Sequence, residues 1–148
     1  MQKKSLLIVD DDEKIIKMLT FLFLSKGYRV NAAKNGIEAL EQLESSIPSA
    51  IILDLAMPRM DGFILYDKVQ GQDNLKTIPV IVLSALPVED NLYKLNLQDP
   101  GHYVLKPFRT AELSSLVKEV TKDIAQEETS HHFEFCTNAK LYIESSKI

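Results

Sequence analysis

The chain has 148 residues, 45% hydrophobic and 26% charged, which predicts a globular domain with a sizeable core. A net charge of −4 and a pI near 5.4 argue against non-specific nucleic-acid binding, which needs a basic surface. The single cysteine, Cys136, excludes an intramolecular disulfide and a cysteine-based zinc site. Because no apolar run approaches the ~20 residues of a membrane span and no signal-peptide pattern opens the chain, we expect a soluble, cytoplasmic protein.

Short apolar runs alternate along the chain with segments of helical periodicity. In chain order, we predict a strand over 5–9, a helix over 13–26, a strand over 28–32, a helix over 37–43, a strand over 50–54, a helix over 62–69, a strand over 80–83, a helix over 88–97, a strand over 102–105 and a helix over 111–124. Asp12 is predicted to cap the first helix and Gly27 to end it, and Thr110 is predicted to cap the last helix.

Strict alternation of strands and helices predicts an α/β fold with a parallel sheet covered by helices on both faces. Ligands of such sheets bind at the carboxyl ends of the strands. Four of the five predicted strands deliver polar groups to that edge, and these groups are Asp10-Asp11-Asp12, Asp54, Ser84 and Lys106. Asp54 follows a wholly apolar run, and because burying a lone carboxylate is costly, we expect it at the strand end, near solvent.

Four short motifs stand in order at the predicted strand ends. They are the acid cluster after Leu6-Leu7-Ile8-Val9, the segment Leu53-Asp54-Leu55-Ala56-Met57-Pro58 with Asp61-Gly62, the segment Leu83-Ser84-Ala85, and Tyr103 ahead of Lys106-Pro107-Phe108. With these motifs the chain resembles the receiver domain of two-component response regulators over about residues 5–122. The resemblance implies a flavodoxin-like, doubly wound sheet of five parallel strands in the order 2-1-3-4-5 with five helices. It also implies a receiver domain over 1–124 and a C-terminal extension over 125–148.

The resemblance implies a Mg²⁺ site and a phosphoacceptor at the sheet edge. Asp11 and Asp54 would bind Mg²⁺ directly, Asp10 would act mostly through water, and the backbone carbonyl of Ala56 would complete the protein ligands. Asp54 would accept the phosphoryl group as an aspartyl phosphate. The Lys106 ammonium would neutralise charge on the phosphoryl oxygens.

The resemblance also assigns roles to the hydroxyl of Ser84 and the aromatic ring of Tyr103. Ser84 would hydrogen-bond a phosphoryl oxygen, and Tyr103 would be the switch aromatic that turns inward when Ser84 moves toward the phosphate. In the family the bond between Lys106 and Pro107 is often cis, the one common setting for that isomer.

Each of these residues also has a simpler interpretation. The acid triplet can cap the first helix, Lys106 can be a surface lysine, Ser84 can satisfy the backbone at a strand end, and Tyr103 can be a core aromatic.

The favoured function is that of a phosphoacceptor response regulator, which takes phosphate from a phosphohistidine donor and switches a partner-binding surface. On this interpretation the chain is not a turnover enzyme, although it assists its own phosphotransfer and slow dephosphorylation. One alternative is a Mg²⁺-dependent hydrolase with Asp54 as covalent nucleophile, but such enzymes usually have a second Asp two residues on, where this chain has Ala56. A flavin-binding electron carrier shares the fold, but the acid triplet would repel the flavin phosphate.

The expected partners are a histidine kinase or a histidine phosphotransfer protein, and a downstream protein or further output domain. A homodimer through the face of the fourth helix, fifth strand and last helix is also an expectation, whereas nucleic acid and membrane are not expected partners. Family members often have Gly-Ala before the fifth strand, where this chain has Asp99-Pro100-Gly101, so the identity of the partner does not follow by analogy.

The extension contains a linker-like segment, 126–130, and two alternating runs, 132–136 and 140–143, which suit a hairpin or the start of a further domain. It is too short to hold a DNA-binding module. Ala56 and Leu86 stand where family members commonly flank the attacking water, and neither side chain can orient water. We therefore predict slow self-dephosphorylation.

Overall fold

The computed structural model describes residues 3–55, 62–87 and 102–122. Ala56, the helix predicted over 88–97 and the C-terminal extension lie outside these residues, and so the structure does not address them. None of the described helices is long and apolar enough to cross a membrane.

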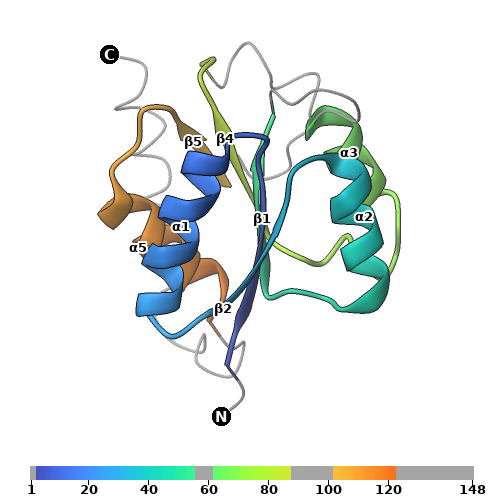
Figure 1. Cartoon of the computed structure of the whole chain (residues 1–148). Coiled ribbons are helices and arrows are strands. Elements are labelled where there is room, and N and C mark those ends of the chain that lie inside the picture. Colours follow the sequence, from blue (N-terminus) through green and yellow to red (C-terminus); the bar gives the residue numbers. More distant parts are fainter. Residues whose placement is uncertain (1–2, 56–61, 88–101, 123–148) are drawn as a thin grey trace, which may run out of the picture.

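Within the described residues the structure has five strands and four of the five predicted helices, in the predicted order. They are β1 (Ser5–Val9), α1 (Glu13–Ser25), β2 (Arg29–Ala33), α2 (Gly36–Ser45), β3 (Ala50–Asp54), α3 (Gly62–Gln70), β4 (Val80–Ser84), β5 (Tyr103–Leu105) and α5 (Thr110–Val120). The strands pair in parallel in the order β2-β1-β3-β4-β5, which confirms the predicted sheet (Figure 1).

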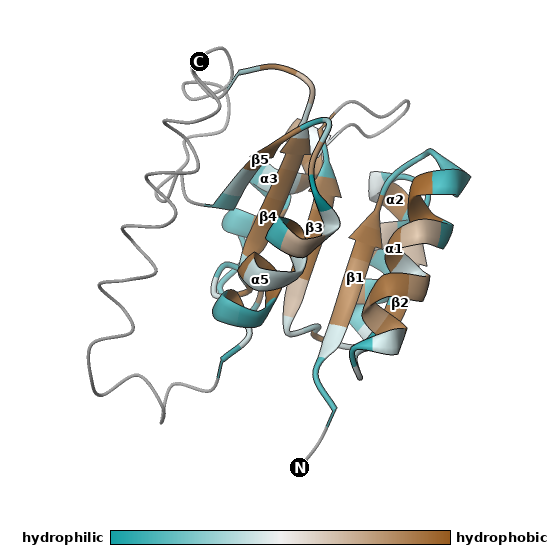
Figure 2. Cartoon of the chain, turned by 90° about the vertical axis from the view of Figure 1, so that its left-hand side faces the viewer, coloured by the Kyte–Doolittle hydropathy of each residue, from teal (hydrophilic) through white to brown (hydrophobic). Residues whose placement is uncertain are grey.

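Each face of the sheet carries its own hydrophobic core. Because successive side chains of a strand point to opposite faces, Leu7 and Ile51 pack with α2 and α3, whereas Leu6 and Ile52 pack with α1 and α5. Figure 1 shows these helix pairs on the two sides of the sheet, and Figure 2 shows that the central strands are hydrophobic along their length. All five residues of β3 are buried, so the continuous apolar run before Asp54 is explained by cover on both faces. Asp54 ends the strand as predicted, but it is buried and not near solvent, because neighbouring elements cover the strand end.

The first helix begins at the predicted residue and ends at Ser25, one residue before its predicted end. The Asp12 side chain caps it by accepting a hydrogen bond from the Lys14 backbone N–H (2.9 Å). At its end Gly27, with φ of +93°, donates to the Leu24 carbonyl, and Tyr28 donates to the Phe23 carbonyl, the two bonds of a Schellman motif. The rings of Phe23 and Tyr28 pack edge to face, with their centroids 5.6 Å apart. Since the N–H of Tyr28 belongs to this motif, β2 begins one residue later than predicted, at Arg29.

The last helix departs from its predicted bounds at both ends. Thr110 is not its cap but its first helical residue, because the Leu113 N–H bonds to the Arg109 carbonyl (3.1 Å) and Arg109 takes the cap position without a side-chain bond. The helix ends at Val120, and the Thr121 hydroxyl donates to the Val117 carbonyl (2.7 Å). Burial of Leu113 and Val117 therefore positions this helix more than any capping side chain does.

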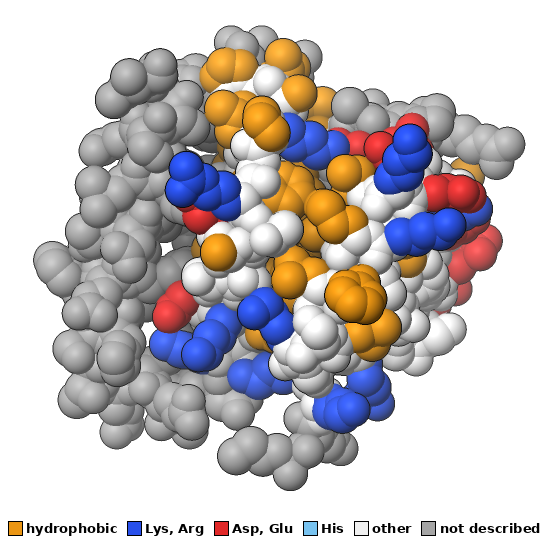
Figure 3. All heavy atoms as spheres, turned by 60° about the vertical axis from the view of Figure 1, so that its left-hand side comes forward, with side chains coloured by type: hydrophobic (Ala, Val, Ile, Leu, Met, Phe, Trp, Pro, Cys, Tyr) orange, Lys and Arg blue, Asp and Glu red, His pale blue; other side chains and the backbone are white. Residues whose placement is uncertain are grey.

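The outer side of α1 is unusually apolar. Phe21 is 78% exposed and Leu24 is 54% exposed. Figure 3 views this side of the molecule, where hydrophobic side chains lie among lysines and arginines.

Candidate functional site

The strand register brings the polar residues predicted from the sequence to one edge of the sheet. Val9 pairs with Leu53, so Asp10 and Asp54 leave neighbouring strands side by side. Ser84 pairs with Leu105 at the end of β4, and the Lys106 N–H bonds to the Ser84 carbonyl at 2.7 Å. Four strands thus present their functional side chains within one small region.

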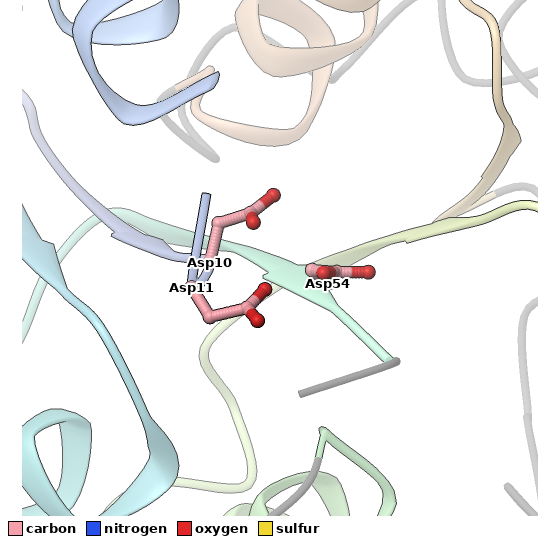
Figure 4. A group of neighbouring side chains, drawn as sticks. All are labelled: Asp10, Asp11 and Asp54. Carbon is pink, nitrogen blue, oxygen red and sulfur yellow. The ribbon is translucent and has the colours of Figure 1, made fainter. Parts of the chain in front are cut away.

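Three carboxylates form the centre of this region (Figure 4). Oxygen atoms of Asp10, Asp11 and Asp54 all lie within 4.8 Å of one another. Asp10 is 2% exposed and Asp54 is 5% exposed, whereas Asp11 is open to solvent. Like charges at this spacing repel, and the repulsion is strongest where water is excluded.

Asp10 shows the strain of this arrangement. Its Oδ1 accepts a hydrogen bond from the Asp12 N–H (2.9 Å), but its Oδ2 is buried and has no hydrogen-bond partner among the described residues. Burial raises the pKa of Asp10 from 3.8 to about 6; the bond from Asp12 opposes that rise and the charge of Asp54 adds to it. The folded chain therefore favours a proton or a cation beside Oδ2.

Lys106 brings a positive charge to the carboxylates. Its Nζ lies 3.4 Å from Oδ1 of Asp54 and 3.8 Å from Oδ2 of Asp10, and its peptide bond to Pro107 is cis. One ammonium does not balance three carboxylates, so the set keeps a net negative charge. Clustered carboxylate oxygens, one of them buried without a hydrogen bond, fit a hard divalent cation such as Mg²⁺.

The side chains of Ser84 and Tyr103 both form hydrogen bonds with the backbone of Leu86. The Ser84 Oγ accepts a hydrogen bond from the Leu86 N–H (3.1 Å), and the Tyr103 hydroxyl donates to the Leu86 carbonyl. Ser84 is 6% exposed, and the Tyr103 ring is buried in the core on the α2 and α3 side. Sequence reasoning selected both residues but missed the Leu86 backbone, since a backbone link leaves no signal in side-chain identity.

Gly62 positions the other wall of the site. A Cβ at this position would lie 2.4 Å from the Asp54 carbonyl oxygen and 2.5 Å from the Leu55 Cα, so only glycine fits. The Gly62 N–H bonds to the Leu55 carbonyl (3.1 Å). The sequence predicts a helix that starts at Gly62, beside Asp61, but the close approach that requires glycine depends on how α3 packs against the end of β3.

The sequence matches a known protein family and curated relatives over most of its length. The model of the response regulator receiver domain matches residues 6–118. A curated relative, the probable transcriptional regulator ycf27 of Porphyridium aerugineum, is 32% identical over 125 residues, covering 84% of this chain and 50% of the relative. This chain spans about half the length of the curated transcriptional regulators that it matches.

Solved structures match the whole fold. The signal receiver domain of a signal transduction histidine kinase from Syntrophus aciditrophicus is 30% identical with a TM-score of 0.73, covering 86% of this chain and 96% of that one. The response regulator TrrA of Thermotoga maritima, in complex with Mg(2+)-BeF, is 30% identical with a TM-score of 0.68, covering 79% of this chain and 98% of that one.

Proposed function

Since this chain belongs to the response regulator receiver domains, we propose that it is the phosphoacceptor of a two-component phosphorelay and that Asp54 receives the phosphoryl group. The observation that carries this proposal is the placement of the Asp54 carboxylate at the end of β3, beside two further carboxylates and 3.4 Å from the Lys106 ammonium. The chain works as a signalling phosphoacceptor and not as a turnover enzyme.

Mg²⁺ is the cofactor of this site. Asp11 and Asp54 would hold it directly and Asp10 mostly through water, and the carbonyl of Ala56 would be the fourth protein contribution. When bound, the ion neutralises carboxylate and phosphoryl oxygens, the role of metal ions in phosphoryl transfer. The close approach of the three carboxylates and the buried Oδ2 of Asp10 support this assignment.

Phosphotransfer then needs little beyond positioning and charge. A carboxylate oxygen of Asp54 attacks the phosphorus of a phosphohistidine, the phosphorus–nitrogen bond breaks, and the imidazole leaves with that electron pair. The Lys106 ammonium, already beside Asp54, neutralises charge on the transferred oxygens. The hydroxyl of Ser84 donates a hydrogen bond to one of them.

Movement of Ser84 toward the phosphoryl group would couple phosphorylation of Asp54 to the position of Tyr103. Its Oγ now accepts from the Leu86 N–H, and Tyr103 bonds to the carbonyl of the same residue. A phosphoryl group that draws Ser84 toward Asp54 alters the turn over 84–86, and through it the position of Tyr103. Phosphorylation shifts the equilibrium because the phosphoryl group contacts Ser84 in only one of the two states.

This assignment defines the partners in broad terms. The donor is a histidine kinase or histidine phosphotransfer protein in the cytoplasm, and the receiver unit extends over 1–124. The output is a downstream protein or a further domain joined through residues 125–148, and the phosphorylated form can pair through the surface that includes β5 and α5. The chain itself does not contact nucleic acid.

Incubation with acetyl phosphate and Mg²⁺, followed by intact-mass measurement, tests the proposal. We expect the mass of one phosphoryl group to be added to the wild-type chain and to the Asp67→Asn variant, whose carboxylate is exposed on α3. Asp54→Asn should gain nothing. Continuous release of phosphate from an ester without a stable adduct would instead favour the hydrolase.

A further inference from the structure

A basic groove lies at the amino-terminal edge of the sheet, opposite the acidic site. It has a volume of about 570 Å³ and is formed by the start of β1, the end of α1 and one side of α5. Its lining consists of Lys4, Lys26, Gly27, Tyr28, Ser114, Ser115 and Lys118. That volume is within the range of about 300–1,000 Å³ typical of binding pockets, so the groove can take several side chains.

The charge of the groove is one-sided. Lysines are the charged residues in its lining, and among the described parts of the chain none of these lysines joins an ion pair. The basic side chains on this face are visible in Figure 3. The hydroxyls of Ser114 and Ser115 add hydrogen-bonding groups, and Tyr28 adds an aromatic surface. Such a lining suits an extended segment that carries carboxylates and aromatic rings.

The chain itself supplies a segment of this kind, and it begins beside the groove. The Thr121 Oγ1 lies 3.4 Å from the Tyr28 hydroxyl, so the polypeptide leaves α5 next to a groove residue. Residues 123–136 include four acidic residues and no lysine or arginine, and Phe133 and Phe135 alternate near their end. From Lys122 to Glu127 an extended chain covers at most about 17 Å.

We propose that residues 123–136 dock into this groove, with Glu127 and Glu128 facing its lysines. The attachment at Thr121 makes this contact intramolecular, so the local concentration of the segment is on the order of millimolar and weak ion pairs suffice to hold it. The same tether favours this segment over a free anion. Docking does not depend on phosphorylation of Asp54, and it adds a distinct interaction surface to the receiver.

Paramagnetic relaxation measured on the full chain tests the proposal. In a Cys136→Ser background, Ser130→Cys places a single nitroxide label two residues after Glu128. We expect loss of the amide signals of Gly27, Tyr28 and Ser115, while amides over 71–76 persist. Raising the salt from about 0.1 M to about 1 M, which shortens the Debye length from about 10 Å to about 3 Å, should restore the lost signals.

Charge substitutions separate docking from proximity alone. Glu127→Gln with Glu128→Gln, or Lys26→Gln with Lys118→Gln, should restore the signals, whereas the matched change of Glu41→Gln with Glu44→Gln on α2 should not. The proposal is wrong if broadening is absent, is uniform, or survives these substitutions. It is also wrong if broadening arises only between a labelled and an unlabelled copy, or if inorganic phosphate perturbs the groove amides while the label stays distant.

Discussion

At the scale of single residues, Asp10 shows most clearly how the carboxylate cluster destabilises the fold when no metal is bound. It is 2% exposed, it faces Asp54, and the nearest ammonium, Lys106, is 3.8 Å from its Oδ2. Its raised pKa means that, without metal, the charged form of this carboxylate lowers the stability of the fold at neutral pH. A bound cation removes that cost, so one residue links folding to metal binding.

Asp10→Asn should stabilise the metal-free chain at pH 7. The pKa of Asp10 is about 6 in the folded chain against an ordinary 3.8, so the folded state binds more protons between these values and stability falls as pH rises through them. At pH 7 the full penalty applies, and its removal is worth about 1–3 kcal/mol. Asparagine keeps the Oδ1 that accepts from Asp12.

Urea unfolding with a chelator, at pH 4 and pH 7, measures this effect. The free energy of unfolding of the wild type should decrease more between the two pH values than that of Asp10→Asn, whereas the exposed Asp67→Asn should follow the wild type. A less stable Asp10→Asn at pH 7, or an unchanged pH dependence, contradicts this account.

The apolar residues Ala56 and Leu86 should prolong the life of the phosphorylated state. Leu86 is 53% exposed next to Ser84, and Ala56 follows Asp54 by two residues. Because neither side chain orients water, Ala56→Asn with Leu86→Glu should speed loss of the phosphoryl group by roughly tenfold. Decay of a radiolabelled phosphoryl group measures the rate, and Leu24→Glu, an equally exposed apolar position on α1, is the control. Unchanged or slower decay in the double variant would refute this.

At the scale of elements, close contacts between a strand end and the next helix place the site. The start of α3 lies against the end of β3 at Gly62, and the cap of α1 directly follows the acid cluster. The Asp12 side chain bonds within the helix cap, while its backbone N–H bonds Asp10, so capping and orientation of the site use the same turn. These junctions hold the carboxylates close despite their repulsion.

Gly62→Ala should be strongly destabilising. A methyl group there would lie 2.4 Å from a backbone oxygen of β3, so α3 or the strand end must shift, at a cost of about 2 kcal/mol or more. Gly27→Ala is the comparison, because its Cβ meets nothing within 4 Å and only its positive φ is strained, at about 1 kcal/mol. Urea unfolding measures both. A Gly62→Ala chain no less stable than Gly27→Ala would show that the junction yields freely.

At the scale of the whole molecule, the sheet separates two oppositely charged ends. Carboxylates gather where the strands end, and lysines gather where they begin. Two separate cores, one on each face, lie between these ends and include residues of β1, β3 and β4. On the proposed function, the hydrogen bonds of Leu86 offer a phosphoryl signal a route through the turn over 84–86 to β5.

The fragment 1–124 should fold and accept phosphate by itself. The family model matches residues 6–118, all within this fragment, and exposed ion pairs contribute little to stability. Its thermal midpoint should stay within about 3 °C of that of the full chain. Circular dichroism and the acetyl phosphate assay measure both properties, with the full chain in parallel. An unfolded or aggregated fragment would place the domain boundary within the extension.

The sequence by itself determined the element order, the parallel sheet, the strand order that family resemblance implied, and which residue types stand at each strand end. Periodicity, caps such as Asp12 and breakers such as Gly27 act within a few residues, so they can be recognised without tertiary contacts. Thr110 was wrong as a cap because packing of Leu113 and Val117 outweighed its local preference.

Only the tertiary structure decided the distances and burial on which the chemistry depends. The 3.4 Å approach of Lys106 to Asp54, the hydrogen bond of Tyr103 to Leu86 and the basic groove join segments distant in sequence. The buried Oδ2 of Asp10 and the need for glycine at 62 depend on how neighbouring elements pack. Such contacts arise from the packing of whole elements, and desolvation at Asp10 depends on every neighbour at once. No local pattern encodes either.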